Sequence, residues 1–290
     1  MQKSEFKDRL SKGPPLLLPG VATPLAARVA QDVGFEALYV TGAGVANTEL
    51  GLPDIGILNL TDMASAVERI SGVVDLPLVV DADTGYGNSV NCYHAVRRLE
   101  AAGATVIQLE DQVFPKRCGH FEGKEVVTTA EMVGKIRAAC DARRSENTLI
   151  MGRTDACATE GYEAAIERAA RYAEAGADIL FIEAMTDEAQ LRDATSRNDR
   201  PHLVNVVHGG KTPALRAEEF GKMGYRLVLY ANAALQASVA GMQHVLQGLR
   251  TDGSLSNVSD RLAGFPERQR MVRTPEWDAL RQHYEGEQSS

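Results

Sequence analysis

The chain has 290 residues, of which 44% are hydrophobic and 24% are charged, and its formal net charge is −8. This composition is ordinary for a globular protein, and the length suits a single α/β barrel of roughly 250 residues. The negative charge and the lack of long Lys/Arg blocks argue against nucleic acid as a partner, whereas a local basic cluster could still hold a small anion. No apolar run approaches the length of about 18 residues that a membrane span needs.

Cysteine usage indicates the cellular compartment. The four cysteines, at positions 92, 118, 140 and 157, show no Cys-x-x-Cys spacing. We therefore expect neither a disulfide framework nor a zinc site, and a reducing cytoplasm is predicted.

Short apolar runs alternate with amphipathic stretches along almost the whole chain. The runs are rich in Val, Ile and Leu, as in strands that are buried on both faces. They predict strands at residues 16–19, 37–41, 78–83, 106–110, 149–153, 179–183, 203–207 and 227–230. Helical patterns lie between them, and several end in a glycine that signals a helix C-terminus. These patterns predict helices at residues 24–33, 62–71, 90–102, 129–142, 162–175, 187–193 and 217–223.

Eight strands joined by helical crossovers predict a closed (β/α)8 TIM barrel. The alternative is an open doubly wound sheet, which would usually carry a phosphate-binding glycine fingerprint after its first strand, and this sequence has none. We expect residues 1–250 to form the barrel and residues 251–290 to form a C-terminal helical extension with a disordered tail. Apolar residues such as Trp277, Leu280 and Tyr284 have little local core and predict that the extension packs on a partner subunit.

Acidic residues follow two of the predicted strands. Asp81 and Asp83 close one strand, and in an ideal strand both would project to one face. Glu110 closes the next strand along the chain. Oxygen ligands of this kind suit Mg²⁺, with Mn²⁺ as an alternative, whereas the simpler interpretation is that these acids cap helices or pair with Arg.

Cys118 lies between Lys116, Arg117 and His120. A lone cysteine is usually a small buried hydrophobe, and this interpretation suits Cys92, which lies in a helical pattern. Cationic neighbours instead lower the pKa of a thiol, so Cys118 could give or take a proton at carbon.

Two other strand ends could bind an anion. Arg153 is well shaped for bidentate capture of a carboxylate, although it could simply pair with Asp155 or Glu183. The sequence TGAG at residues 41–44 offers free backbone N–H groups, and a mere tight turn explains it equally well.

Taken together, these segments resemble the isocitrate lyase/phosphoenolpyruvate mutase superfamily over roughly residues 10–250. The resemblance rests on DADTGYGN at residues 81–88, EDQ at 110–112, KRCGH at 116–120 and RTDA at 153–156. GLPD at residues 51–54 and GGKTP at residues 209–213 add to it.

The resemblance implies a (β/α)8 barrel that forms a homotetramer, in which the helix after strand eight is swapped between subunits. It implies Mg²⁺ and a carboxylate substrate, either a 2-hydroxy or a 2-oxo dicarboxylate. The implied magnesium shell is Asp81, Asp83 and Glu110, with Asp54 joining through water. The implied carboxylate cradle is Thr41, Gly42 and Ala43 with Arg153 as clamp, and Cys118 is the implied acid/base. Further implied substrate contacts are Tyr39, Lys116, Gly119, His120, Glu183, Asn205 and Thr212.

Within the superfamily, KRCGH resembles the carbon–carbon lyases that act on methylisocitrate or dimethylmalate, and the related oxaloacetate hydrolase. Carboxyphosphonoenolpyruvate mutase is also similar in the segments around residues 116–124 and 209–213. Two positions depart from the lyase pattern, because His208 replaces a Glu and Ala231-Asn232 replaces a Pro-containing segment. Both would face the distal part of the substrate, so they bear on substrate identity more than on reaction type.

The expected activity is Mg²⁺-dependent cleavage of a 2-hydroxy di- or tricarboxylate into a 2-oxo acid and a succinate-like acid. In that reaction Cys118 would protonate the carbanion, and Tyr39 or a metal-bound water would take the hydroxyl proton. The alternatives are an oxaloacetate hydrolase or a phosphonate mutase on the same scaffold. A metabolite-binding protein without turnover is disfavoured, because it has no use for the thiol.

Overall fold

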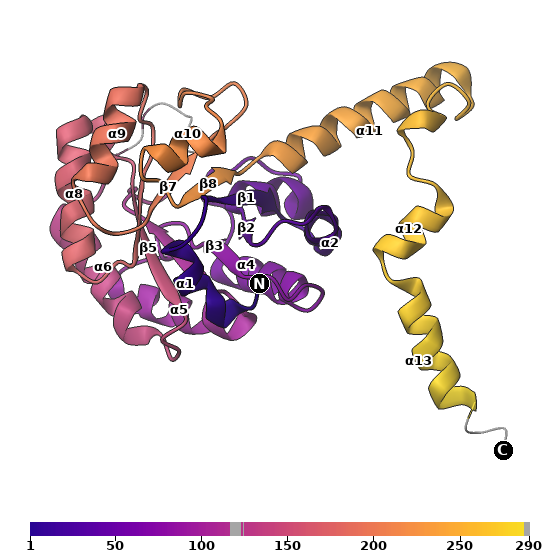
Figure 1. The fold of residues 1–290 in the computed structure, drawn as a ribbon, viewed down its shortest axis with the longest axis horizontal. Helices are drawn as coiled ribbons and strands as arrows, with labels where there is room; N and C mark the ends of the chain where they lie inside the picture. The colour runs from indigo at the N-terminus through magenta and orange to yellow at the C-terminus, as the bar shows by residue number, and fades with distance from the viewer. Residues whose placement is uncertain (117–122, 124, 287–290) are drawn as a thin grey trace.

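The structure, a computed structural model, describes residues 1–116, 123 and 125–286. Eight parallel strands close into a barrel in sequence order, and β8 returns to pair with β1. This confirms the predicted (β/α)8 barrel, and Figure 1 shows helices arranged around it. The strands are β1 Leu16–Val21, β2 Leu38–Val40, β3 Leu78–Asp81, β4 Val106–Glu110, β5 Leu149–Thr154, β6 Ile179–Ile182, β7 His202–Asn205 and β8 Leu227–Tyr230.

Helices lie at all seven predicted positions, with ends that differ by a few residues at most. They begin and end where side chains and glycines satisfy free backbone groups. The Thr23 side chain, for example, accepts a hydrogen bond from Ala26 N, and Gly34 ends the same helix in the left-handed region at φ 99°. These helices are α2 Pro24–Val33, α4 Leu60–Ser71, α5 Ser89–Ala102, α6 Thr129–Ala142, α8 Tyr162–Glu174, α9 Glu188–Ser196 and α10 Ala217–Lys222.

The sequence patterns did not indicate the shorter helical segments or the long helix after β8. The short segments are η1 Lys3–Glu5, α1 Phe6–Leu10, α3 Gly42–Val45, the π-helix η2 Ala46–Leu50, α7 Ala156–Thr159 and η3 Ser259–Arg261. The long helix is α11 Ala233–Asp252, and α12 Phe265–Met271 and α13 Thr274–Gly286 follow it. The expected disordered tail falls mainly on residues 287–290, which lie outside the described residues.

The barrel has two hydrophobic layers. Leu18, Val79, Met151 and Phe181 pack inside the barrel, and a larger layer lies between the strands and the surrounding helices. Strands with apolar side chains on both faces therefore bury both, as their sequences predict. The packed interior leaves the carboxyl ends of the strands as the place where polar side chains can gather.

The barrel closes at a tight seam between β1 and β8. Leu16 pairs with Leu227 and Pro19 pairs with Tyr230. A Cβ atom on Gly20 would lie 1.8 Å from the carbonyl oxygen of Ala231, so only glycine fits there. The missing side chain lets the segment after β8 turn in over the end of the barrel.

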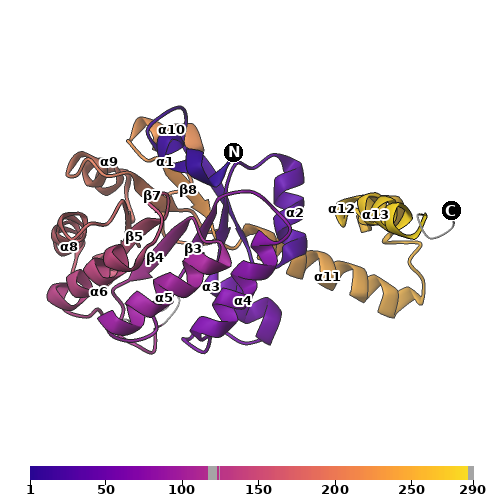
Figure 2. The ribbon, with the colours of Figure 1, turned by 90° about the horizontal axis from the view of Figure 1, so that it is seen from below.

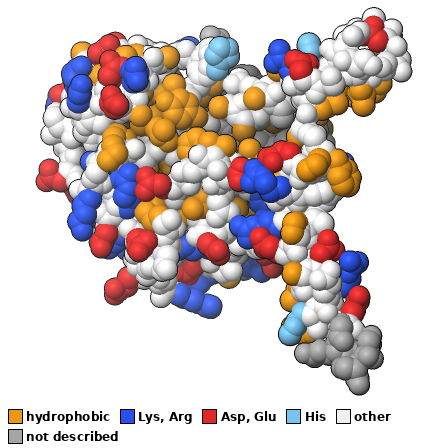
Figure 3. All heavy atoms as spheres, turned by 45° about the vertical axis from the view of Figure 1, so that its right-hand side comes forward, with side chains coloured by type: hydrophobic (Ala, Val, Ile, Leu, Met, Phe, Trp, Pro, Cys, Tyr) orange, Lys and Arg blue, Asp and Glu red, His pale blue; other side chains and the backbone are white. Residues whose placement is uncertain are grey.

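The chain leaves the barrel after β8. Figures 1 and 2 show α11 extending away from the barrel, and α12 and α13 follow it, with α12 returning beside α2, where Arg270 pairs with Asp32. No residue of α11 is buried, and its apolar side chains Val239, Met242 and Leu246 are exposed. Figure 3 shows hydrophobic side chains on the surface of this arm. None of the described helices combines the length and apolar character that a membrane crossing requires.

Candidate functional site

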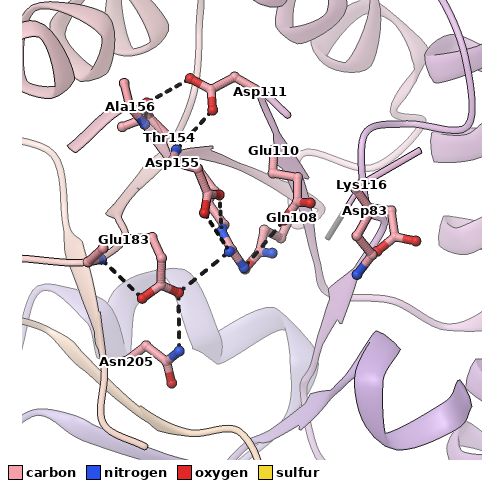
Figure 4. Close-up of polar contacts among 12 residues, drawn as sticks. Asp83, Gln108, Glu110, Asp111, Lys116, Thr154, Asp155, Ala156, Glu183 and Asn205 are labelled. Atoms are coloured by element: carbon pink, nitrogen blue, oxygen red, sulfur yellow. Dashed lines mark hydrogen bonds and ion pairs between the residues drawn. The ribbon is translucent and has the colours of Figure 1, made fainter. Parts of the chain in front are cut away.

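The site is a small cavity at the carboxyl ends of the strands, with a free volume of about 40 Å³. This is room for a few water molecules. Figure 4 shows the polar side chains that converge around it. Ten of the residues predicted from the sequence line it: Tyr39, Thr41, Ala43, Asp54, Asp81, Glu110, Lys116, Arg153, Glu183 and Asn205.

Asp81 ends β3 and organises the turn that follows. Its Oδ1 accepts a hydrogen bond from Asp83 N at 3.1 Å, and its Oδ2 accepts one from Gly42 N at 3.3 Å. The expectation that Asp83 continues an ideal strand is wrong, because β3 ends at Asp81 and Asp83 adopts φ 48°. The turn, and not the strand pleat, sets the two carboxylates apart: Asp81 lines the cavity, whereas Asp83 does not line it and reaches the site through its ion pair with Lys116.

Lys116 lies among the acids. Its Nζ is 2.7 Å from Asp54 Oδ1 and 2.7 Å from Asp83 Oδ1, and its side chain is 4% exposed. Burial alone would lower the pKa of Lys116, but Asp83, Asp81 and the other acids raise it well above its usual range. Lys116 is therefore charged and holds Asp54 and Asp83 together.

Burial shifts the pKa values of two acids around the cavity upward. Burial raises the pKa of Asp83 to about 7 even though Lys116 lies beside it. Burial likewise raises the pKa of Glu110 well above its usual range despite the Arg153 guanidinium. Both shifts indicate carboxylates that would be stabilised by a further cation.

Arg153, at the end of β5, is the centre of a second ion-pair cluster. Its Nε and Nη2 reach the carboxylate of Asp155 at 2.9 and 3.2 Å, and its Nη1 lies 3.3 Å from Glu110 Oε2. Its Nη2 also lies 3.6 Å from Glu183 Oε2, which in turn accepts a hydrogen bond from Asn205 Nδ2 at 3.2 Å. The pairing with Asp155 and Glu183 that the sequence left open is therefore present.

Tyr39 is linked to Asp81 through a buried amide. Its hydroxyl donates to Gln108 Oε1 at 2.8 Å, and Gln108 Nε2 donates to Asp81 Oδ1 at 3.2 Å. Burial raises the pKa of Tyr39 well above its ordinary value, and the neighbouring Asp81 adds to the shift. The phenol is therefore held in its neutral, donating form.

A buried carboxylate behind the cavity fixes this end of β5. Asp111 accepts hydrogen bonds from Thr154 Oγ1 at 2.6 Å, Asp155 N at 2.9 Å and Tyr172 Oη at 2.7 Å. Because Asp155 in turn holds Arg153, Asp111 is a positioning residue for the guanidinium. Neither the role of Asp111 nor that of Gln108 was predicted from the sequence. For Gln108 the available signal was a polar residue in the middle of an apolar strand.

The described residues suit a hard divalent cation in the chemistry of their donors. Glu110 Oε1 is buried and has no hydrogen-bond partner within the described part of the chain. All the acids offer carboxylate oxygens, the ligands that Mg²⁺ prefers. No group of three His, Cys, Asp or Glu side chains there is already spaced to hold an ion directly. Water ligands, or displacement of Lys116 from Asp83, would have to complete such a site.

Three of the predicted site residues, Cys118, Gly119 and His120, lie outside the described residues. Thr212 lies in the loop between β7 and α10 and is not among the residues that line the cavity.

Comparison with known proteins agrees with this arrangement. The sequence matches the phosphoenolpyruvate phosphomutase family over residues 6–250. It is 40% identical to the 2,3-dimethylmalate lyase of Eubacterium barkeri over 264 residues, which cover 91% of each chain. It is 41% identical to the 2-methylisocitrate lyase of Aeropyrum pernix over 257 residues, which cover 89% of this chain and 82% of the relative.

Solved structures give the same result. The crystal structure of a 2,3-dimethylmalate lyase superposes with a TM-score of 0.91 at 34% identity, covering 97% of this chain and 94% of that one. A phosphonopyruvate hydrolase in complex with oxalate and Mg²⁺ superposes with a TM-score of 0.88 at 27% identity, covering 98% and 99% of the two chains. With a family match over most of its length and relatives at about 40% identity, the chain belongs to the phosphoenolpyruvate phosphomutase family, within the PEP mutase/isocitrate lyase superfamily.

Proposed function

We propose that this protein is a carbon–carbon lyase that cleaves a 2-hydroxy di- or tricarboxylate into a 2-oxo acid and a second carboxylic acid. The observation that carries the proposal is the identity of about 40% to lyases of this kind over some nine-tenths of the chain. The acidic, cation-containing cavity at the strand ends supports it, because such a site can bind several carboxylates and stabilise the charge that cleavage develops.

The proposed cofactor is Mg²⁺, for which Asp81, Asp83 and Glu110 would supply carboxylates, with Asp54 joining through water. When bound, the ion would polarise the hydroxyl and carboxylate oxygens of the part that becomes the 2-oxo acid. Support comes from the buried Glu110 Oε1, which has no hydrogen-bond partner among the described residues.

The chain's own residues would orient the substrate and move protons. Arg153, already aligned by Asp155, would hold the substrate carboxylate, and the backbone around Thr41, Gly42 and Ala43 would cradle it. Tyr39 is held neutral by its raised pKa and is therefore a poor base, and it would donate to a substrate oxygen only by turning its single proton away from Gln108 Oε1. We keep Cys118 as the proposed acid that protonates the leaving carbanion, with His120 and Gly119 beside it in sequence.

We further propose a homotetramer in which α11 packs on a neighbouring subunit. Its support is the unburied helix α11 and an apolar groove of about 380 Å³ beside it, lined by Leu25 and Val29 of α2 and by Leu235. Burial of such surface on a second copy is the usual way to remove exposed apolar area. The cytoplasmic location stays a prediction that rests on the cysteine spacing.

A coupled assay for pyruvate and glyoxylate tests the function. Isocitrate, 2-methylisocitrate and 2,3-dimethylmalate are supplied with Mg²⁺ or with EDTA, and oxaloacetate is supplied in a separate arm with product analysis. We expect 2-oxo acid release from at least one 2-hydroxy acid with Mg²⁺ and none with EDTA. Hydrolysis of oxaloacetate to oxalate and acetate, without cleavage of any 2-hydroxy acid, would make a hydrolase the correct assignment.

A further inference from the structure

Asn232 has an arrangement that no role so far explains. It directly precedes α11, the position from which an Asn side chain usually caps a helix. Its side chain makes no capping hydrogen bond. Asn232 instead lines the cavity, where its Oδ1 is buried and has no hydrogen-bond partner among the described residues. A polar group buried without a partner is costly, so its placement calls for a ligand.

The fold places Asn232 across the cavity from the acids. Asp81 and Glu110 come from β3 and β4, whereas Asn232 follows β8, on the opposite side of a closed eight-stranded barrel. The tight contact of Gly20 with the Ala231 carbonyl fixes the backbone next to Asn232. A substrate whose 2-hydroxy carboxylate end lies at the acids therefore directs its far end towards Asn232.

The side-chain amides of Asn205 and Asn232 lie on this far side of the cavity, and they differ in whether a hydrogen bond fixes their orientation. Asn205 donates its Nδ2 to Glu183, which fixes its Oδ1 as an acceptor, and that Oδ1 is also buried with no hydrogen-bond partner in the described part of the chain. Asn232 makes no such bond, so a rotation of its amide can present NH₂ to the cavity. It also stands at the N-terminus of the twenty-residue helix α11, where the partial positive charge of the backbone favours an anion.

Resting on the function proposed above, we propose that Asn232 is a specificity-determining residue that donates a hydrogen bond to a carboxylate at the far end of the substrate. The chain should then prefer a tricarboxylate such as 2-methylisocitrate to 2,3-dimethylmalate, in which a methyl group replaces the carboxymethyl arm. Beside a methyl group the buried Oδ1 of Asn232 would gain no partner, and discrimination of roughly ten-fold is expected from one such mismatch.

The test compares kcat/KM for the two substrates in Asn232→Leu, Asn232→Asp and the unchanged protein, all with Mg²⁺. Leu and Asp are close to Asn in size, so each changes the polarity more than the shape. Gln236→Leu, one turn further along α11 and exposed, is the matched control. Thermal melting of each variant checks that it folds.

We expect Asn232→Leu to lower the ratio of kcat/KM for 2-methylisocitrate over 2,3-dimethylmalate roughly ten-fold, mainly through KM for the tricarboxylate. Asn232→Asp should lower that ratio further, because its charge repels the carboxylate, and Gln236→Leu should leave it unchanged. If the unchanged protein cleaves both substrates and both Asn232 variants keep the same kcat/KM ratio, this assignment is overturned and the lyase function stays intact. Cleavage of neither of these two substrates nor of isocitrate by the unchanged protein would overturn the function and this inference together.

Discussion

The buried side chain of Lys116 neutralises carboxylates that a bound metal ion would otherwise neutralise. Its ammonium contacts Asp54 and Asp83 at once, and both carboxylates are candidate partners of Mg²⁺. The Lys ammonium is a compact point charge without the planar geometry of a guanidinium. Another cation can therefore take its place beside the carboxylates without a rearrangement of the site. The protein without metal and the protein with metal should therefore depend on Lys116 to different degrees.

Replacement of Lys116 by Met should destabilise the metal-free protein by about 3 kcal/mol or more, because it leaves buried carboxylates uncompensated. Mg²⁺ should restore most of that loss, since the ion binds the carboxylates only in the folded state. Urea unfolding with EDTA and with Mg²⁺ measures both effects.

Lys135→Met is the matched control for this prediction. Lys135 is also buried, but it bonds Thr84 O and lies near Glu131, away from the cavity acids. Its loss should be insensitive to Mg²⁺. Equal insensitivity of Lys116→Met would contradict the view that the ammonium and the ion serve the same carboxylates.

Cys118 is predicted to act as a proton donor to carbon. Cys118→Ser should therefore fold and bind substrate but lose roughly 10²- to 10⁴-fold in kcat, because a serine hydroxyl is a much weaker acid. Cys92→Ser should keep kcat, since Cys92 is buried and burial raises its pKa to about 12. Near-normal turnover by Cys118→Ser would favour a reaction that needs no thiol.

The sequence could predict those site residues that lie at the end of a strand. Asp81, Glu110 and Arg153 are such cases, because the barrel brings strand ends together whatever the loops do. The double ion pair of Lys116 could not be predicted, since it depends on the path of the loop after β4. A place for Asn232 near the distal part of the substrate was expected, but its uncapped amide in the cavity was not, because Asn before a helix ordinarily indicates a cap.

At the scale of elements, the strands were predictable because burial on both faces leaves continuous apolar runs. Two predicted strands were too long at their carboxyl ends, at residues 83 and 207. In both places the chain leaves the strand for a loop at the site end of the barrel. Helix α11 escaped the pattern analysis because it has no buried face within its own chain. Amphipathic periodicity reports a helix that packs on its own barrel, and α11 does not.

The beginning of β7 carries a group that should make stability depend on pH. His202 is buried, packs edge-on against Tyr225 at 6.3 Å between ring centroids, and burial lowers its pKa to about 4. Between the ordinary His pKa near 6.5 and pH 4 the unfolded chain binds a proton that the folded chain does not. Stability is therefore lost as pH falls through this range, by up to about 3 kcal/mol from this residue.

His202→Leu should remove that part of the pH dependence. Urea unfolding at intervals from pH 7 to pH 4 measures the free energy of unfolding of the variant and of the unchanged protein. His94→Gln, at an exposed position on α5, is the control and should keep the full dependence. Parallel curves for His202→Leu and the unchanged protein would contradict the prediction.

At the scale of the whole molecule, the arm of α11, α12 and α13 is the feature that a single chain does not explain. Met242 is 56% exposed and Leu246 is 60% exposed, and Trp277 on α13 is 65% exposed. In the proposed tetramer these side chains would lie against other subunits. The arm would then act as a connector between barrels.

Charge on this face should weaken the assembly. We expect the unchanged protein to have the mass of a tetramer by light scattering, and Met242→Glu with Leu246→Glu to shift it towards smaller species, because two charges would have to be desolvated in the interface. Gln243→Glu adds charge to the same helix at a polar position and serves as the control. A monomeric unchanged protein would contradict the proposed assembly.

The seam between β1 and β8 also sets when the site comes into being during synthesis. Leu16 pairs with Leu227, so almost the whole barrel sequence separates the two strands that close it. Contacts between such distant segments form slowly and late in folding. Asp54, Asp81, Asp83, Glu110 and Glu183 all precede β8 in the chain, whereas Ala231 and Asn232 follow it. A nascent chain that has emerged from the ribosome only as far as β7 therefore already carries every one of these acids but has no closed cavity to gather them.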